Sequence, residues 1–311
     1  GIDDGKEKTS DIIHEIDTWI NQVNDGSKTT MNNALSAEIW SDICADEHAC
    51  EKSRCKYFNT CYFFKMRRKA NFASLILVNH HLLMADISMK METGEETGLL
   101  PKYDILIIDE AHNIFKSAVS FLNESVSTFS IIRQLTKLFN TKSSSGLLTK
   151  VLDRFTQPEI VSSVEKAINL ISGLNPLLTH TVQSEISHLL GNGNEGLYEL
   201  DDPDKRKPLK EILDDHLNTV SLIISIVFPV IKRLKEINDS TVLRSINEEI
   251  LSSLIVEISA AAAKLEAYVE FFEEFLKSTD VDSFVFWGEK RRQAQTVFTI
   301  SPLNIQKLLA E

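Results

Sequence analysis

The chain has 311 residues, 43% of them hydrophobic and 25% charged, which is typical of a globular protein able to bury one or two cores. The longest apolar stretch, residues 220–231, contains serine and proline and is too short to span a membrane, and the N-terminus lacks a signal-peptide pattern. We therefore expect a cytoplasmic protein without a membrane partner. Four cysteines in such a chain favour metal or redox chemistry over structural disulfides.

The net charge of −12 would ordinarily argue against a nucleic-acid partner, but the charge is unevenly distributed. Residues 51–69 hold seven basic residues and one acid, so this window carries +6 and the remainder −18. The window is either a localised anion site or the solvated face of a charged helix. The candidate contacts to DNA phosphates are Lys56, Lys65, Arg67, Arg68 and Lys69.

In chain order, apolar spacing predicts a helix over residues 11–24 and a basic helix with an aromatic face over residues 57–72. Residues 74–78 and 104–108 are short, continuous apolar runs, which indicate strands buried on both faces of a sheet. Residues 191–208 are rich in Gly, Asp and Pro and predict an exposed loop.

Long helical patterns run from about residue 119 to about residue 277 and end in a helix over residues 241–277. Its antiparallel partner is expected over residues 207–236, with a kink at Pro229. Residues 283–287 and 296–300 then predict two further strands. This order indicates an α/β domain that is interrupted by a large helical insertion and then resumes its sheet.

The strongest chemical signal is the motif Asp109-Glu110-Ala111-His112, directly after the predicted strand 104–108. Ligands bind at the carboxyl edge of open α/β sheets, so Asp109 is predicted to hold Mg²⁺ and Glu110 to orient an attacking water. His112 is predicted to couple the phosphate site to nucleic acid. The alternative is that the two acids only cap the helix predicted over residues 111–122.

The second signal is the cysteine array Cys44-x5-Cys50-x4-Cys55-x5-Cys61, which contains no Cys-x-x-Cys pair. Zinc modules usually place paired cysteines two to four residues apart, whereas a looser array suits a larger iron–sulfur cluster. The spacing alone leaves an iron–sulfur cluster, zinc and unligated thiols open.

Together these motifs resemble the DinG branch of the XPD-like superfamily 2 helicases. The resemblance is carried by residues 50–55, 61–64, 67–70, 78–83, 100–104 and 109–113, by Trp40 ahead of the cysteines, and by Trp287 with residues 300–304. It implies ATP-driven DNA unwinding with 5′-to-3′ polarity, a role in DNA repair, a 4Fe–4S cluster, and a single DNA strand threaded between an Arch domain and the cluster segment. Cys50, Cys55 and Cys61 match three of the cluster ligands, and we expect Cys44 to be a bystander rather than the fourth.

The resemblance also implies a fold: a partial P-loop NTPase (RecA-like) helicase domain 1 with a small Fe–S segment and an Arch insertion. Helicase domain 1 is expected over residues 1–35, 73–118 and 281–311, the Fe–S segment over 36–72, and the Arch domain, which could recruit a protein partner, over 119–280. The sequence contains no Gly-x-Gly-Lys-Thr phosphate loop and no second motor domain, so we expect no ATP hydrolysis by this polypeptide alone. The alternative is a non-catalytic DNA- or protein-binding module with a degenerate DEAH site.

Overall fold

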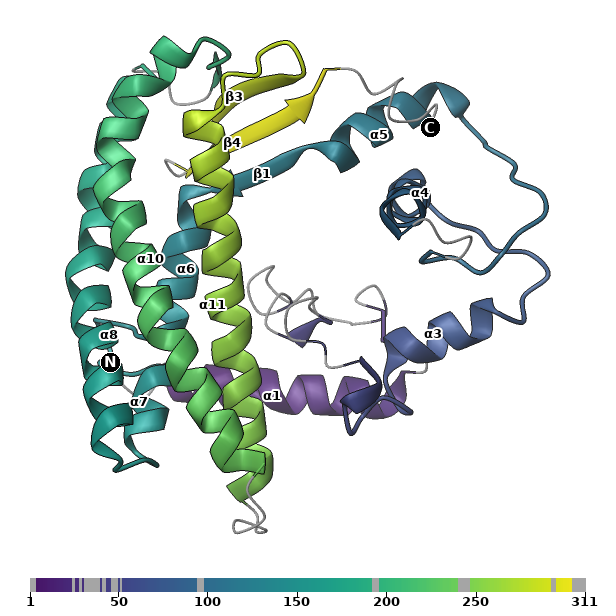
Figure 1. Cartoon of the computed structure of the whole chain (residues 1–311). Coiled ribbons are helices and arrows are strands. Elements are labelled where there is room, and N and C mark those ends of the chain that lie inside the picture. Colours follow the sequence, from purple (N-terminus) through teal and green to yellow (C-terminus); the bar gives the residue numbers. More distant parts are fainter. Residues whose placement is uncertain are drawn as a thin grey trace. The chain divides into compact units, whose positions relative to one another are not determined.

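The structure, a computed structural model, describes residues 4–23, 26–27, 30, 40, 43–45, 50, 52–93, 98–191, 196–239, 247–291 and 295–303. The chain forms two compact units, Gly1–Ile108 and Asp109–Glu311, and each is described by itself (Figure 1).

The first unit is built from short helices: α1 (Asp4–Gln22), η2 (Lys52–Arg54), α3 (Tyr62–Ala70) and α4 (His80–Thr93). Both predicted helices of this region are present, but α1 begins earlier than expected and residues 56–60 form turns ahead of α3. The Tyr62 hydroxyl joins the two helices because it lies 3.0 Å from the carbonyl oxygen of Ile20 and 3.2 Å from that of Val23, at the end of α1. Gly26 (φ +64°) turns the chain there, and a Cβ at this position would lie 2.7 Å from the Tyr62 ring.

The predicted strands over residues 74–78 and 104–108 are wrong for this structure, which assigns neither segment to a strand. Their side chains are open to solvent: Leu77 is 89% exposed and Ile107 86% exposed. A strand needs a hydrogen-bonded neighbour, and within the part of the chain that the structure describes these two segments have none. Apolar sequence alone therefore did not produce the predicted sheet.

The second unit is mainly helical. Its helices are η3 (Ala111–Asn113), α5 (Ile114–Leu122), α6 (Thr128–Leu138), α7 (Leu147–Leu152), α8 (Pro158–Pro176), the π-helical turn η4 (Leu177–Val182), α9 (Gln183–Leu189), α10 (Pro203–Asp239) and α11 (Asn247–Lys277). Ser127 caps α6 by accepting a hydrogen bond from the backbone N–H of Ser130. The helix predicted over residues 111–122 is present as η3 and α5.

Helices α10 and α11 lie side by side in antiparallel directions (Figure 1). Arg206 near the start of α10 contacts Phe275 near the end of α11, and Asn238 at the end of α10 donates to Ser252 near the start of α11. The predicted antiparallel pair is therefore confirmed. Pro229 lies inside α10, which continues to Asp239, and the predicted start of α11 at residue 241 lies outside the described residues.

A four-stranded antiparallel sheet completes the second unit, with the order β1 (Glu124–Ser127), β4 (Gln295–Pro302), β3 (Phe284–Arg291) and β2 (Gly196–Glu199). The two predicted strands near the C-terminus are present as β3 and β4. Their neighbours, however, are β1 and β2 of the same unit, so the expected return to the sheet of residues 74–78 and 104–108 is not observed. The predicted loop over residues 191–208 likewise contains β2 and the start of α10.

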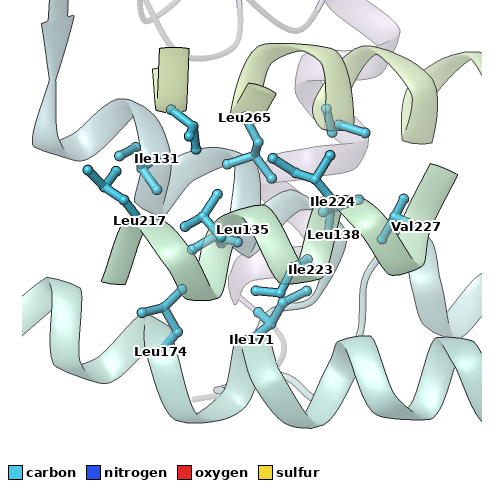
Figure 2. Close-up of a cluster of buried hydrophobic side chains, with 14 of the residues drawn as sticks. Ile131, Leu135, Leu138, Ile171, Leu174, Leu217, Ile223, Ile224, Val227 and Leu265 are labelled. Atoms are coloured by element: carbon cyan, nitrogen blue, oxygen red, sulfur yellow. The ribbon is translucent and has the colours of Figure 1, made fainter. Parts of the chain in front are cut away.

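The core of the second unit lies where α6, α8, α10 and α11 meet (Figure 2). Side chains of Leu135 and Leu138 from α6 point toward Ile171 of α8 and Ile223 of α10, and all four are fully buried. Such close packing of branched side chains is the main source of stability in a helical unit.

At the sheet end of the unit, aromatic rings join α11 to the strands. The Phe272 and Phe298 ring centroids are 5.5 Å apart, and those of Phe275 and Phe286 are 5.7 Å apart. These edge-to-face contacts favour one position of the helix against the sheet.

By length and composition, α10 could also cross a membrane. Eleven of its residues are nevertheless buried within this unit, including Leu209, Leu217, Ile223 and Ile231, so packing accounts for its apolar face.

Candidate functional site

The acid pair lies at a sharp change of chain direction. Glu110 occupies the left-handed region (φ 48°, ψ 47°), which is uncommon for a residue other than glycine. The backbone N–H of Glu110 donates to Oδ1 of Asp109 at 2.9 Å, and the chain then enters η3 and α5. Because left-handed backbone is unfavourable for a side-chain-bearing residue, its presence at the second acid of the pair marks Glu110 as a candidate functional residue.

His112 follows within one turn and contacts the second acid. Its Nδ1 lies 3.2 Å from Oε2 of Glu110, and both side chains are well exposed. An exposed pair of this kind contributes little to stability, so both groups remain available to a ligand.

Residues 104–108 are not a strand in this structure, so the acid pair does not lie at the carboxyl edge of a sheet as predicted. Its two exposed carboxylates are what could bind a cation that arrives with a nucleotide. Mg²⁺ in phosphoryl-transfer sites is usually held by one or two carboxylates together with phosphate oxygens and water. Within the described residues no group of three or more His, Cys, Asp or Glu side chains could hold a metal by itself. Asp109 and Glu110 supply two carboxylates, and phosphate oxygens would have to complete the coordination.

The four cysteines are free thiols, each partly buried. Cys61 immediately precedes α3, and its carbonyl oxygen accepts from the N–H of Lys65. Cys55 follows η2, and its N–H donates to the carbonyl oxygen of Lys52. Among the described residues, these thiols do not form a group that could hold a metal. The spacing of the cysteines in the sequence suits a cluster, whereas the positions of the thiols in this structure do not.

The predicted DNA-contacting cations divide into two groups. Lys56, Lys65 and Lys69 have exposed side chains. Arg67 and Arg68 are partly buried and donate to backbone carbonyl oxygens: Arg68 to Asn59 at 2.9 Å, and Arg67 to Gly98 and Leu99. The two guanidinium groups therefore already have hydrogen-bond partners within the protein.

The aromatic residues of the same segment divide in a similar way. Phe58 and Phe64 pack with ring centroids 4.4 Å apart, whereas Tyr57 is 61% exposed. Several cations lie over these rings, including Lys56 over Tyr57 at 4.7 Å and Arg68 over Phe58 at 5.6 Å. Phe58 and Phe64 thus serve packing, and Tyr57 is an exposed ring on which a base could stack.

The sequence motifs gave no prediction for Asp86, the only charged residue among the fully buried side chains of the described part of the first unit. Its Oδ1 accepts from the N–H of Leu100 at 2.7 Å, and its Oδ2 lies 2.7 Å from Nζ of Lys90. The ion pair raises the pKa of Lys90, although burial alone would lower it. The detectable sequence signal was an acid followed four residues later by a lysine in an apolar helix.

Residues 22–131 match the family model DEAD_2. The resemblance to DinG-type superfamily 2 helicases is therefore confirmed: the chain carries a segment of that class, which includes the cysteine array, α3, α4 and the acid pair.

Among its relatives are two named helicases. The chain is 31% identical over 153 residues to the ATP-dependent DNA helicase YoaA of Escherichia coli, an alignment that covers 48% of this chain and 24% of the relative. It is 28% identical over 159 residues to the ATP-dependent DNA helicase DinG of Salmonella choleraesuis, covering 50% of this chain and 22% of the relative. The chain thus spans about a quarter of the length of the curated relatives that it matches.

Proposed function

We propose that the chain is part of an ATP-dependent DNA helicase of the DinG type with 5′-to-3′ polarity. The observation that carries this proposal is the coincidence of the DEAD_2 match with an exposed acid pair at a left-handed turn, Asp109 and Glu110. The relatives that align over about half of the chain are named ATP-dependent DNA helicases.

In this proposal Asp109 holds Mg²⁺, through water, and Glu110 orients the water that attacks the γ-phosphate. The cation supplies charge neutralisation at the phosphates when it is bound with ATP. The contact of His112 with Glu110 lets His112 influence the position of that carboxylate, which suits its proposed role in coupling nucleotide to DNA.

The finer assignment of fold is also part of the proposal. Residues 73–118, which carry the acid pair, are proposed to belong to a RecA-like helicase domain 1, whose sheet would be formed by regions that the longer relatives have beyond the matched segment. The helical second unit, built on α6, α8, α10 and α11, corresponds to the proposed Arch domain, which could also bind a protein partner. The protein would act in the cytoplasm.

The nucleic-acid part of the proposal rests on charge. The exposed cations Lys56, Lys65 and Lys69 belong to a segment with a net charge of +6. They would contact phosphates of single-stranded DNA without sequence preference. A 4Fe–4S cluster on Cys50, Cys55 and Cys61 is supported by spacing and resemblance, and it would require the backbone of this segment to bring the thiols together. No mechanistic step is derived from it.

The decisive experiment uses the full-length protein and compares wild type with Glu110→Gln. We expect ATP hydrolysis stimulated by single-stranded DNA, and unwinding of a duplex with a 5′ tail but not a 3′ tail. Glu110→Gln should lower hydrolysis about a hundredfold or more while ATP binding persists, because the water-orienting group is lost. Full-length protein that binds DNA but never hydrolyses ATP would favour the alternative, a binding module with a degenerate site.

A further inference from the structure

Two charged side chains hold one short turn of the first unit. The turn, residues 98–101, follows α4 in the chain. Arg67 of α3 donates from Nη2 to the carbonyl oxygens of Gly98 and Leu99, at 3.3 and 3.2 Å. Asp86 of α4 accepts the N–H of Leu100. The turn is therefore attached to two helices through its backbone alone, independently of its own side chains.

The attachment is close-packed as well as hydrogen-bonded. A Cβ on Gly98 would lie 2.6 Å from Oδ1 of Asp86 and 2.8 Å from its carbonyl oxygen, so only glycine fits against the fully buried Asp86. Lys90 lies between Asp86 and the ring of Tyr103, 4.5 Å from the ring centroid. If α3 or α4 is displaced, the turn should therefore move with the helix, because the close packing prevents the two from sliding past each other.

Arg67 and the exposed lysines occupy different sides of α3. Lys65 and Lys69 are four residues apart, so they share a face, whereas Arg67 is two residues from each and cannot share it. The helix thus presents lysines to solvent and Arg67 to the turn. Beyond the turn the chain runs through residues 102–108 directly into the acid pair.

We propose that Arg67 is a positioning residue that transmits contact of DNA with α3 to the segment leading into Asp109 and Glu110, and that it does not itself touch DNA. This inference rests on the proposed function. The physical reason is that the guanidinium already serves two carbonyl acceptors in a partly buried position, and leaving them for a phosphate would cost those charge-assisted bonds. The turn then follows α3 whenever DNA shifts the helix.

The test compares Arg67→Met with a matched control, Arg68→Met, in the full-length protein. Both changes remove one partly buried guanidinium. The Arg68 guanidinium, however, donates to Asn59 and lies over Phe58, both of its own segment, and among the described residues it makes no hydrogen bond to residues 98–101. Amide hydrogen exchange is measured over residues 98–108, with and without a single-stranded oligonucleotide. In Arg67→Met we expect exchange of the Leu100 amide, which donates to Asp86, to rise about tenfold because the turn loses a charge-assisted hydrogen bond, and we expect DNA to cease altering it. Arg68→Met should retain the wild-type response.

Activity and affinity provide the second measurement. In Arg67→Met, the factor by which DNA stimulates ATP hydrolysis should fall about tenfold, and the affinity for DNA should stay within about twofold of wild type. Gly98→Ala, which displaces the turn without altering a charge, should reproduce this result. Arg67→Lys should recover most of the stimulation, because an ammonium can still donate to both carbonyl oxygens.

Two results would overturn the inference. One is a loss of DNA affinity in Arg67→Met that matches the loss of stimulation, since Arg67 would then contact DNA. The other is that Arg67→Met and Arg68→Met show the same amide hydrogen exchange and the same DNA stimulation of ATP hydrolysis. If the wild-type protein shows no ATPase activity, the proposed function fails, whereas the exchange response of residues 98–108 to DNA still decides the role of Arg67.

Discussion

Arg206 and Phe275 connect helices α10 and α11 at one end of the second unit: the Arg206 guanidinium, which is fully buried, donates to the carbonyl oxygen of Phe275. A second nitrogen of the same group donates to Ser278 at 2.7 Å, and the cation lies 4.2 Å from the centroid of the Phe286 ring. One side chain therefore caps the end of α11 and fixes α10 against both α11 and strand β3.

Replacing Arg206 by Met should destabilise the second unit by about 3 kcal/mol, because the carbonyl oxygens at the end of α11 lose a charged donor in a buried position. Chemical denaturation measures the free energy of unfolding. The control is Arg233→Met, which removes only an exposed pair with Glu236 and should cost about 0.5 kcal/mol or less. Equal losses in the two variants would show that Arg206 has no special role.

The apolar face of α10 provides a matched pair of neighbouring residues. Ile223 is fully buried and Leu222 is 43% exposed. Ile223→Ala should therefore lower the free energy of unfolding by about 2–4 kcal/mol and Leu222→Ala by less than about 1 kcal/mol. Similar, small effects of both changes in detergent-free buffer would contradict the packing of α10 within this core.

The carboxyl group of Glu124 on β1 should make stability depend on pH. Partial burial, and secondly the nearby charge of Glu274, raise the pKa of Glu124 above its ordinary value of 4.5. A raised carboxyl pKa means that the folded state binds the proton more tightly, so this stabilisation is present in acid and is lost as the pH rises through the folded pKa.

We therefore expect Glu124→Gln to raise the Tm at pH 7.5 by about 1 °C, a small shift because the group is partly solvated, and the difference from wild type to shrink toward pH 4. Glu274→Gln should give part of the same gain by removing the repulsion. A lower Tm of Glu124→Gln at pH 7.5 would be inconsistent with this cause. Differential scanning calorimetry at several pH values is the appropriate measurement.

Lys65 and Lys69 should account for part of the salt dependence of DNA binding. Because each phosphate contact on a single strand contributes about 0.7 to the slope of log K against log salt, the double alanine variant should lower that slope by about 1.4. Fluorescence anisotropy with a single-stranded oligonucleotide measures both affinity and slope. Lys207→Ala, which changes an exposed lysine paired with Asp204 in the second unit, is the control. An unaltered slope in the double variant would remove α3 from the DNA path.

Iron content separates the proposed roles of the cysteines. In protein purified without oxygen, Cys55→Ser should lose most of its iron and the visible absorption of a cluster, whereas Cys44→Ser should keep both. Zinc in place of iron in the wild-type protein would instead indicate a zinc site. Retention of iron in Cys55→Ser would exclude Cys55 as a ligand, and loss of iron in Cys44→Ser would make Cys44 the fourth.

Much of the helical structure could be predicted because apolar side chains repeat with the period of the helix. The pattern that ends at Phe275 marked α11, and Ile12 with Ile16 marked α1. The same reasoning failed for residues 74–78 and 104–108, because an apolar run specifies burial without supplying the neighbouring strand. Within the candidate site the sequence indicated Asp109, Glu110 and His112, but it did not indicate Asp86, whose role depends on Leu100 and Gly98.

By itself, the sequence determined the class of protein, the order of its motifs and the location of most helices, because each of these depends on residues close together in the chain. Only the tertiary structure decided that β3 and β4 pair with β1 and β2, that Arg67 turns toward residues 98–101 while Lys65 and Lys69 remain exposed, and that Arg206 joins α10 to α11. Those outcomes depend on contacts between residues distant in sequence, whose partners compete for the same hydrogen bonds and the same buried volume.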